Sequence, residues 1–106
     1  MRYIVKAYRP NKGVSKDKST GREFSWDKMD LQLAVRDDRP NVPTPVGEDW
    51  RETISIKNEI NNNNVVIKSG FTVNSFDDLI GCEVLPLYDR WGKISSVQII
   101  SQNAKF

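Results

Sequence analysis

Apolar and polar residues alternate over short stretches along most of this chain, and this pattern predicts an all-β protein. A period of two places every second side chain on the same face of a strand. No apolar run approaches the roughly 20 residues that a membrane-spanning helix needs, and the first residues lack the long apolar stretch of a secretory signal. The alternation predicts strands at residues 2–8, 23–36, 51–60, 82–88 and 94–100, with further β structure at 65–73.

One short helix is expected among these strands, near residues 75–80. Ser75 precedes Asp78 by three positions, which is the spacing of a capping box. Gly81 follows where the end of a helix favours glycine. Glycine within residues 89–93 predicts a hairpin turn between the last two strands.

The order of these elements is three strands, a short helix and two strands, which is the order of an OB-fold. We therefore predict a small OB-like Greek-key β-barrel of five or six strands. At 106 residues the chain has the length of one domain, so residues 1–106 form a single unit. Residues 9–22, punctuated by proline and glycine, predict a mobile basic loop, and residues 101–106 a short tail.

The second predicted strand, residues 23–36, contains a conflict of phase. The apolar residues of its second half share one face, whereas Phe24 and Trp26 fall on the other face by strict alternation. Either a bulge near residues 27–28 returns the two aromatic residues to the core, or they point away from it. Trp26 is accordingly a core residue, a base-stacking residue or part of a dimer interface.

Charge is distributed unevenly along the chain. Residues 1–22 carry seven basic groups and one acid, whereas the remaining residues carry nine basic and thirteen acidic groups. A positive edge on a mildly negative body suits the binding of a polyanion, although a solvated lysine-rich loop would have the same composition.

Several kinds of chemistry are excluded by composition. The chain has no histidine and one cysteine, Cys82, so histidine-dependent catalysis, internal disulfides and thiolate zinc clusters cannot form. Cys82 is expected to act as a small buried apolar residue. The paired acids at 37–38, 48–49 and 77–78 have no spacing specific to catalysis or to a metal. We expect no enzymatic activity, no metal and no cofactor.

Cations and aromatic residues occur together in the N-terminal third. Non-specific binding of a single strand needs a basic track for the phosphates and aromatic faces for the bases. These groups would lie close together if residues 2–8 and 23–36 pair as a hairpin, although Tyr8 could instead cap the barrel. A second cluster of this kind lies in the turn at 89–93. The predicted nucleic-acid-binding residues are Tyr8, Arg9, Lys12, Lys16, Lys18, Arg22, Phe24, Trp26, Arg90 and Trp91.

Residues 18–25, Lys-Ser-Thr-Gly-Arg-Glu-Phe-Ser, followed by an amphipathic strand, resemble the DNA-binding hairpin of the filamentous-phage helix-destabilising proteins. Residues 81–99 are similar to the closing hairpin of those proteins and of many OB-folds. The family comprises small dimeric proteins of OB type that bind single-stranded DNA. The resemblance therefore implies a homodimer of a phage or mobile element, acting in DNA replication or transfer in the cytoplasm of a bacterial host. Residues 37–50 and the asparagine run 61–64 are additional to that pattern.

Two functions from different classes follow. The first is non-sequence-specific binding of single-stranded nucleic acid, either DNA or RNA, because the contacts that distinguish them are side-chain details. The alternative is a protein-interaction module, such as a phage-encoded inhibitor of a host protein. The basic edge with its aromatic residues favours the first function, and the acidic remainder suits the second.

Overall fold

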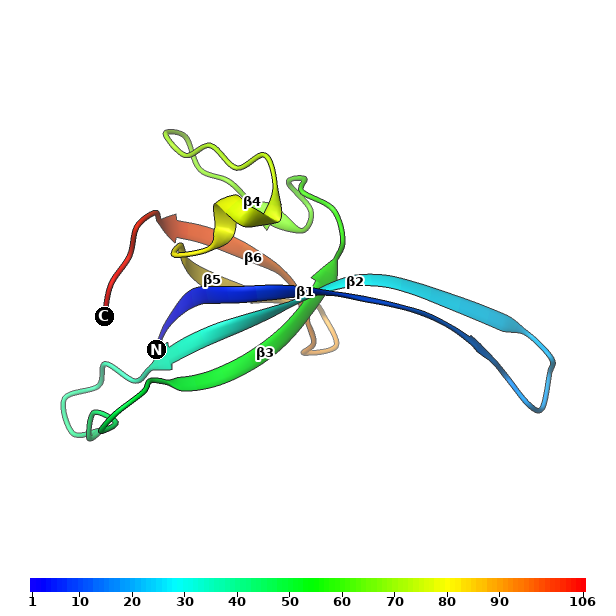
Figure 1. Ribbon diagram of the computed structural model, residues 1–106, viewed down its shortest axis with the longest axis horizontal. Helices are drawn as coiled ribbons and strands as arrows, with labels where there is room; N and C mark the ends of the chain where they lie inside the picture. The colour runs from blue at the N-terminus through cyan, green and yellow to red at the C-terminus, as the bar shows by residue number, and fades with distance from the viewer.

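The computed structural model describes residues 1–106, and six strands and one helical turn make up its regular structure (Figure 1). One sheet contains all the strands in the order β3-β2-β1-β5-β6-β4. The sheet curls so that β3 comes into contact with β6, but no hydrogen-bonded ladder joins the two. The predicted all-β, OB-like Greek-key fold is confirmed, and its barrel is partly open. The elements are β1 (Arg2–Lys16), β2 (Glu23–Arg36), β3 (Trp50–Lys57), β4 (Val65–Val66), η1 (Phe76–Leu79), β5 (Glu83–Tyr88) and β6 (Ile94–Ser101).

The core lies inside the curled sheet. β2 directs Met29, Leu31 and Leu33 inward, and the neighbouring strand β3 adds Ile54 and Ile56. Cys82 also belongs to this core, with 2% of its surface exposed, as the sequence predicted. Burial raises the pKa of its thiol, so the group stays protonated at neutral pH.

The predicted short helix is a single 3-10 turn that covers one side of the barrel. The Asp78 carboxylate accepts a hydrogen bond from the backbone N–H of Ser75 at 3.2 Å, which ties the start of the turn. Phe76 and Leu79 are buried in the core, so η1 is held by apolar packing. No helix of the structure is long or apolar enough to cross a membrane.

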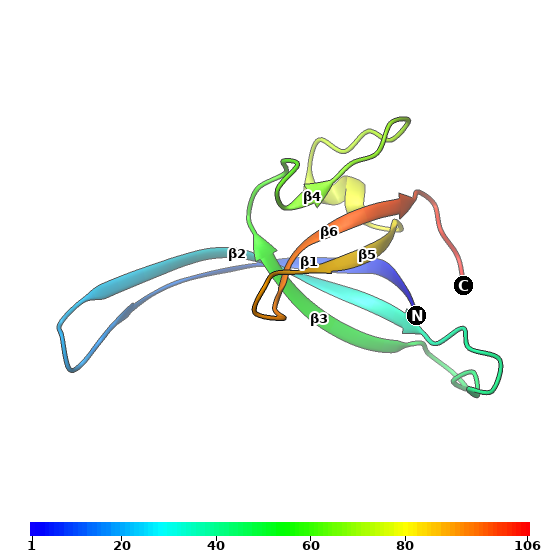
Figure 2. The same cartoon turned by 180° about the vertical axis from the view of Figure 1, so that it is seen from behind.

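Beyond the barrel, β1 and β2 continue as a two-stranded ribbon, residues 9–28, which we call the arm (Figures 1 and 2). This corrects the expected loop over residues 9–22, because β1 extends through Lys16 and only residues 17–22 form the turn. Pro10 does not interrupt the ribbon, since β1 has a partner on one side only along the arm, and proline is tolerated at such an edge.

The phase conflict in β2 is resolved without a bulge in that strand. β2 keeps one register with β3 along their shared length. The irregularity in the β1–β2 ladder lies in β1, between Val5 and Ala7. Phe24 and Trp26 therefore stay on the face opposite the core residues of β2, with 49% and 40% of their surfaces exposed.

Other segments differ from the expectations in length. β3 ends at Lys57, and β structure after the asparagine run is limited to Val65–Val66. The tail is not extended into solvent, because the Phe106 ring lies beside the guanidinium groups of Arg2 and Arg36, at 5.4 and 4.8 Å.

Candidate nucleic-acid interface

The two faces of the arm carry different side chains. Residues directly paired across an antiparallel ribbon point to the same face. We call the face that bears the aromatic residues the outer face, and it continues onto the exposed side of the β1–β2–β3 sheet. From the tip towards the barrel, its pairs are Ser15–Phe24, Gly13–Trp26, Asn11–Lys28 and Arg9–Asp30.

Two of the predicted cations lie on the reverse face. Lys12 and Lys16 alternate with Val14 there, and Lys12 Nζ lies 3.8 Å from Asp27 Oδ2. These two lysines and the aromatic residues therefore lie on opposite faces of the ribbon and do not alternate along one face. Arg9 is the cation of the β1 half of the arm that shares the outer face with Trp26.

Trp26 is held in place by two residues of the opposite strand. Its ring covers Gly13 so closely that a Cβ atom there would lie 2.1 Å from Cζ2 of the indole. Its Nε1–H donates a hydrogen bond to Oδ1 of Asn11 at 3.1 Å. The indole is thus fixed against the ribbon while part of it remains open to solvent.

A chain of hydrogen bonds connects Trp26 to the barrel. Asn11 Nδ2 donates to Asp30 Oδ1 at 3.3 Å, and the Ser55 hydroxyl on β3 donates to the same carboxylate. Arg9 lies 3.9 Å from Asp30 Oδ2. The Ser55 hydrogen bond, together with Asn11 and Arg9, lowers the pKa of Asp30, so the carboxylate is charged at neutral pH.

The tip of the arm presents cations around an internally bonded acid. The backbone N–H and the hydroxyl of Ser19 donate to Asp17 Oδ1 at 2.9 and 2.8 Å, and these bonds lower the pKa of Asp17. Gly21 supplies the positive φ that the turn requires, at 70°. Lys18 and Arg22 remain exposed on this turn.

Two lysines that the sequence reasoning missed lie between Trp26 and the barrel. Lys28 on β2 pairs directly with Lys57 on β3, and both are exposed. Like charges directly opposite each other are destabilising in a sheet. A bound anion would remove that repulsion, so this row is suited to a phosphate.

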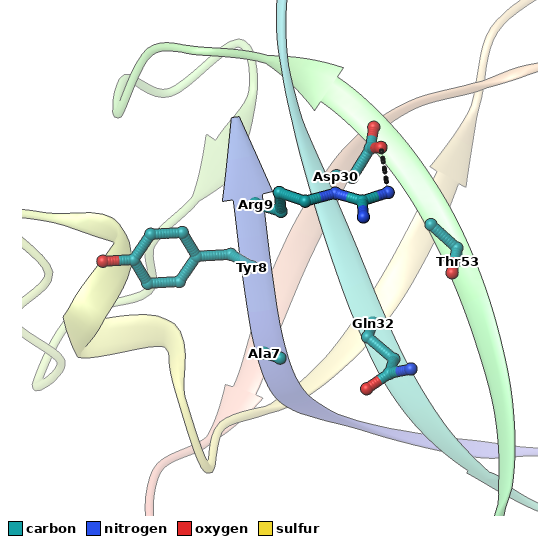
Figure 3. A pocket seen from close by; sticks show the side chains of 6 residues that line it. All are labelled: Ala7, Tyr8, Arg9, Asp30, Gln32 and Thr53. Atoms are coloured by element: carbon teal, nitrogen blue, oxygen red, sulfur yellow. Dashed lines mark ion pairs between the residues drawn. The ribbon is translucent and has the colours of Figure 1, made fainter. Parts of the chain in front are cut away.

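At the foot of the arm the outer face has a cavity of about 260 Å³ (Figure 3). Ala7, Gln32 and Thr53 form one row across β1, β2 and β3 and line it. The Arg9–Asp30 ion pair borders the cavity on the side towards the arm.

Tyr8 lies apart from the aromatic residues of the arm. Figure 3 shows its side chain directed towards the helical turn, away from Gln32 and Thr53. Its ring centroid is 5.9 Å from that of Phe76, and its hydroxyl donates a hydrogen bond to Asp77, which raises the pKa of Tyr8. This is the position of a residue that caps the barrel.

The other predicted pair, Arg90 and Trp91, forms the tip of the β5–β6 turn. The guanidinium carbon lies 4.2 Å from the centroid of the indole, and 70% of Trp91 is exposed. The turn lies at the end of the barrel from which the arm leaves (Figures 1 and 2).

No protein-family model, no curated protein and no solved structure matches this chain. The geometry of the outer face accordingly carries the assignment of a function. The residues that the sequence reasoning missed there could have been found only from the pairing register, because none of their types by itself marks a binding site. They are Asn11, Gly13, Lys28, Asp30, Gln32, Thr53 and Lys57.

Proposed function

We propose that this protein binds single-stranded nucleic acid, DNA in the first instance, along the outer face of the arm and without sequence specificity. Trp26 and Phe24 stack on bases, while Lys28, Lys57 and the cations of the tip contact phosphates. The observation that carries the proposal is the pair of aromatic side chains exposed on one face of a basic ribbon that projects from the barrel.

The arm offers no alternative use for these side chains within one copy of the chain. A two-stranded ribbon has no second layer, so Phe24 and Trp26 have no core to enter. Base–aromatic stacking contributes about 1–3 kcal/mol per base and tolerates every base, because each base has a π face. The fixed orientation of Trp26 lowers the conformational entropy that binding would otherwise cost.

The resemblance to the phage helix-destabilising proteins supports DNA over RNA. A homodimer, a phage or mobile-element origin and a role in DNA replication or transfer in a bacterial cytoplasm are part of the same proposal. Arg90 and Trp91 belong to it as a second contact at the same end of the barrel.

The alternative, a protein-interaction module, is favoured by a feature away from the arm. Trp50 is 73% exposed and borders an apolar cavity of about 460 Å³ lined by Val35, Val42 and two prolines. An exposed tryptophan beside an apolar hollow is typical of a protein contact.

Quenching of the tryptophan fluorescence tests the proposal. We expect an oligo-dT strand to quench more strongly than a duplex of equal length. Binding should weaken with salt by about 0.7 log units per phosphate contact for each log unit of salt. Equal quenching by the duplex would contradict the single-strand assignment. No quenching by either, in a folded protein, would favour the alternative.

A further inference from the structure

The cavity at the foot of the arm lies on the path that a strand bound to the outer face would follow. Trp26 and Gln32 are six residues apart on the same face of β2, a distance of about 20 Å at the rise of a β-strand. The Lys28–Lys57 row lies between them. A strand stacked on Trp26 and held by these lysines therefore reaches the cavity next.

The small side chain of Ala7 leaves space beside the larger residues that line the cavity. Ala7 pairs with Gln32, which in turn pairs with Thr53. The row therefore has a small side chain on β1 and polar side chains on β2 and β3. Gln32 and Thr53 are exposed residues, and their side chains carry an amide and a hydroxyl. Each offers both a donor and an acceptor to a ligand.

The charge beside the cavity selects the part of a nucleotide that can enter. Asp30 lines the cavity and is charged at neutral pH, so it offsets the attraction that its ion-pair partner Arg9, also a lining residue, would have for a phosphate. Its Oδ2 accepts a long hydrogen bond from Asn11 Nδ2 at 3.4 Å, and Arg9 lies 3.9 Å away, beyond hydrogen-bond distance. A carboxylate oxygen has two acceptor sites, so Oδ2 keeps capacity to accept a further N–H. A carboxylate accepts readily from the exocyclic amine of a base, whereas it repels a carbonyl oxygen at that position.

We propose that this cavity holds one base of the bound strand and prefers a base with an exocyclic amine, such as cytosine, over uracil or thymine. Gln32 and Thr53 hydrogen-bond the edge of the base, and Asp30 accepts from its amine. This inference rests on the proposed function, since it describes a subsite of the same outer face. It adds a base preference to binding that otherwise has no sequence specificity.

Binding of oligo-dC and oligo-dU of equal length, measured by fluorescence anisotropy at one salt concentration, tests this subsite. The two bases differ at position 4, where cytosine has an amine and uracil a carbonyl oxygen, and neither has the thymine methyl group. We expect the unmodified protein to bind oligo-dC about five-fold more tightly or better. The double variant Gln32→Leu/Thr53→Val keeps the shape of the two side chains on an exposed sheet surface but removes the groups that orient the base towards Asp30, so in it the ratio should fall towards one.

Trp26→Ala is the matched control, because it should weaken both oligonucleotides and leave their ratio unchanged. Equal affinity of the unmodified protein for the two strands would overturn the base preference while the proposed function stands. An unchanged ratio in the double variant would overturn the assignment to this cavity. Absence of binding to both strands would overturn the proposed function, and the subsite with it.

Discussion

A single missing side chain determines how Trp26 lies on the arm. Gly13 has no positive φ, so its backbone accepts a larger residue, but a Cβ atom there would lie within 2.6 Å of three indole atoms. We expect Gly13→Ala to displace the indole and to lose up to the 1–3 kcal/mol that one base stack contributes, roughly, with little change in thermal stability. Oligonucleotide affinity and the melting temperature measure the two effects. Ser15→Ala is the control, and equal affinity of Gly13→Ala and the unmodified protein would contradict this role.

Lys57 provides a prediction about salt. Its charge faces Lys28 on the outer face, where a phosphate would separate the two. We expect Lys57→Gln to reduce the slope of log affinity against log salt by about 0.7, the value for one phosphate contact of a single strand. Lys68→Gln, at an exposed position outside the sheet, should leave the slope unchanged. Identical slopes for the two variants would exclude Lys57 from the phosphate track.

Asp37 gives the fold a defined sensitivity to acid. Hydrogen bonds from Arg39 lower its pKa to about 2, against an ordinary value of 3.8. The folded state therefore gains stability above pH ~4, and this gain is lost as the pH falls towards 2. A pH change from 5 to 2.5 roughly spans this window. Over it, we expect the midpoint of urea unfolding to drop less in Asp37→Asn than in the unmodified protein. Equal drops would contradict the contribution of this pair.

At the scale of elements, the arm is separable from the barrel. No residue between Lys12 and Asp27 belongs to the core cluster. Replacing residues 12–27 by Asn-Gly would join Asn11 to Lys28, a directly opposed pair, through the favoured two-residue hairpin turn. We expect the shortened protein to melt within a few degrees of the full chain and to bind oligonucleotides more weakly, because the stacking residues and the cations of the tip are lost. Unchanged affinity after the deletion would place the interface elsewhere.

The sequence allowed some elements to be predicted better than others. Residues 23–36 form β2 with the predicted bounds, because their alternation is long and strong. Residues 9–22 predict a loop, since Pro10 and Gly13 are typical breakers and only the pairing with β2 makes their strand conformation clear. The phase conflict of Phe24 and Trp26 was visible in the sequence. The way in which the structure resolves this conflict could not be predicted. The irregularity lies in β1, and a one-residue shift in that strand leaves no pattern in the sequence.

The whole molecule is elongated, and its two ends differ. Its extents are 52 × 32 × 26 Å, and its radius of gyration of 15.9 Å exceeds the value of about 13 Å for a compact domain of this length. The arm, with its aromatic outer face, forms one end, and the connection between β2 and β3, beside Trp50, lies at the other (Figure 1). At this scale the order of elements predicted the OB-like topology, whereas the projection of the arm depends on register and could not be predicted.

Trp26 and Trp50, two of the three exposed tryptophans, lie at opposite ends of the molecule and allow the most direct test of the central claim. Oligo-dT affinity is measured for Trp26→Ala and for Trp50→Ala under the same conditions, with circular dichroism to show that both variants fold. We predict that Trp26→Ala loses about 1–3 kcal/mol of binding free energy, the contribution of one stacked base, and that Trp50→Ala binds as the unmodified protein does. Unchanged affinity in folded Trp26→Ala, or an equal loss in Trp50→Ala, would contradict the assignment of nucleic-acid binding to the outer face of the arm.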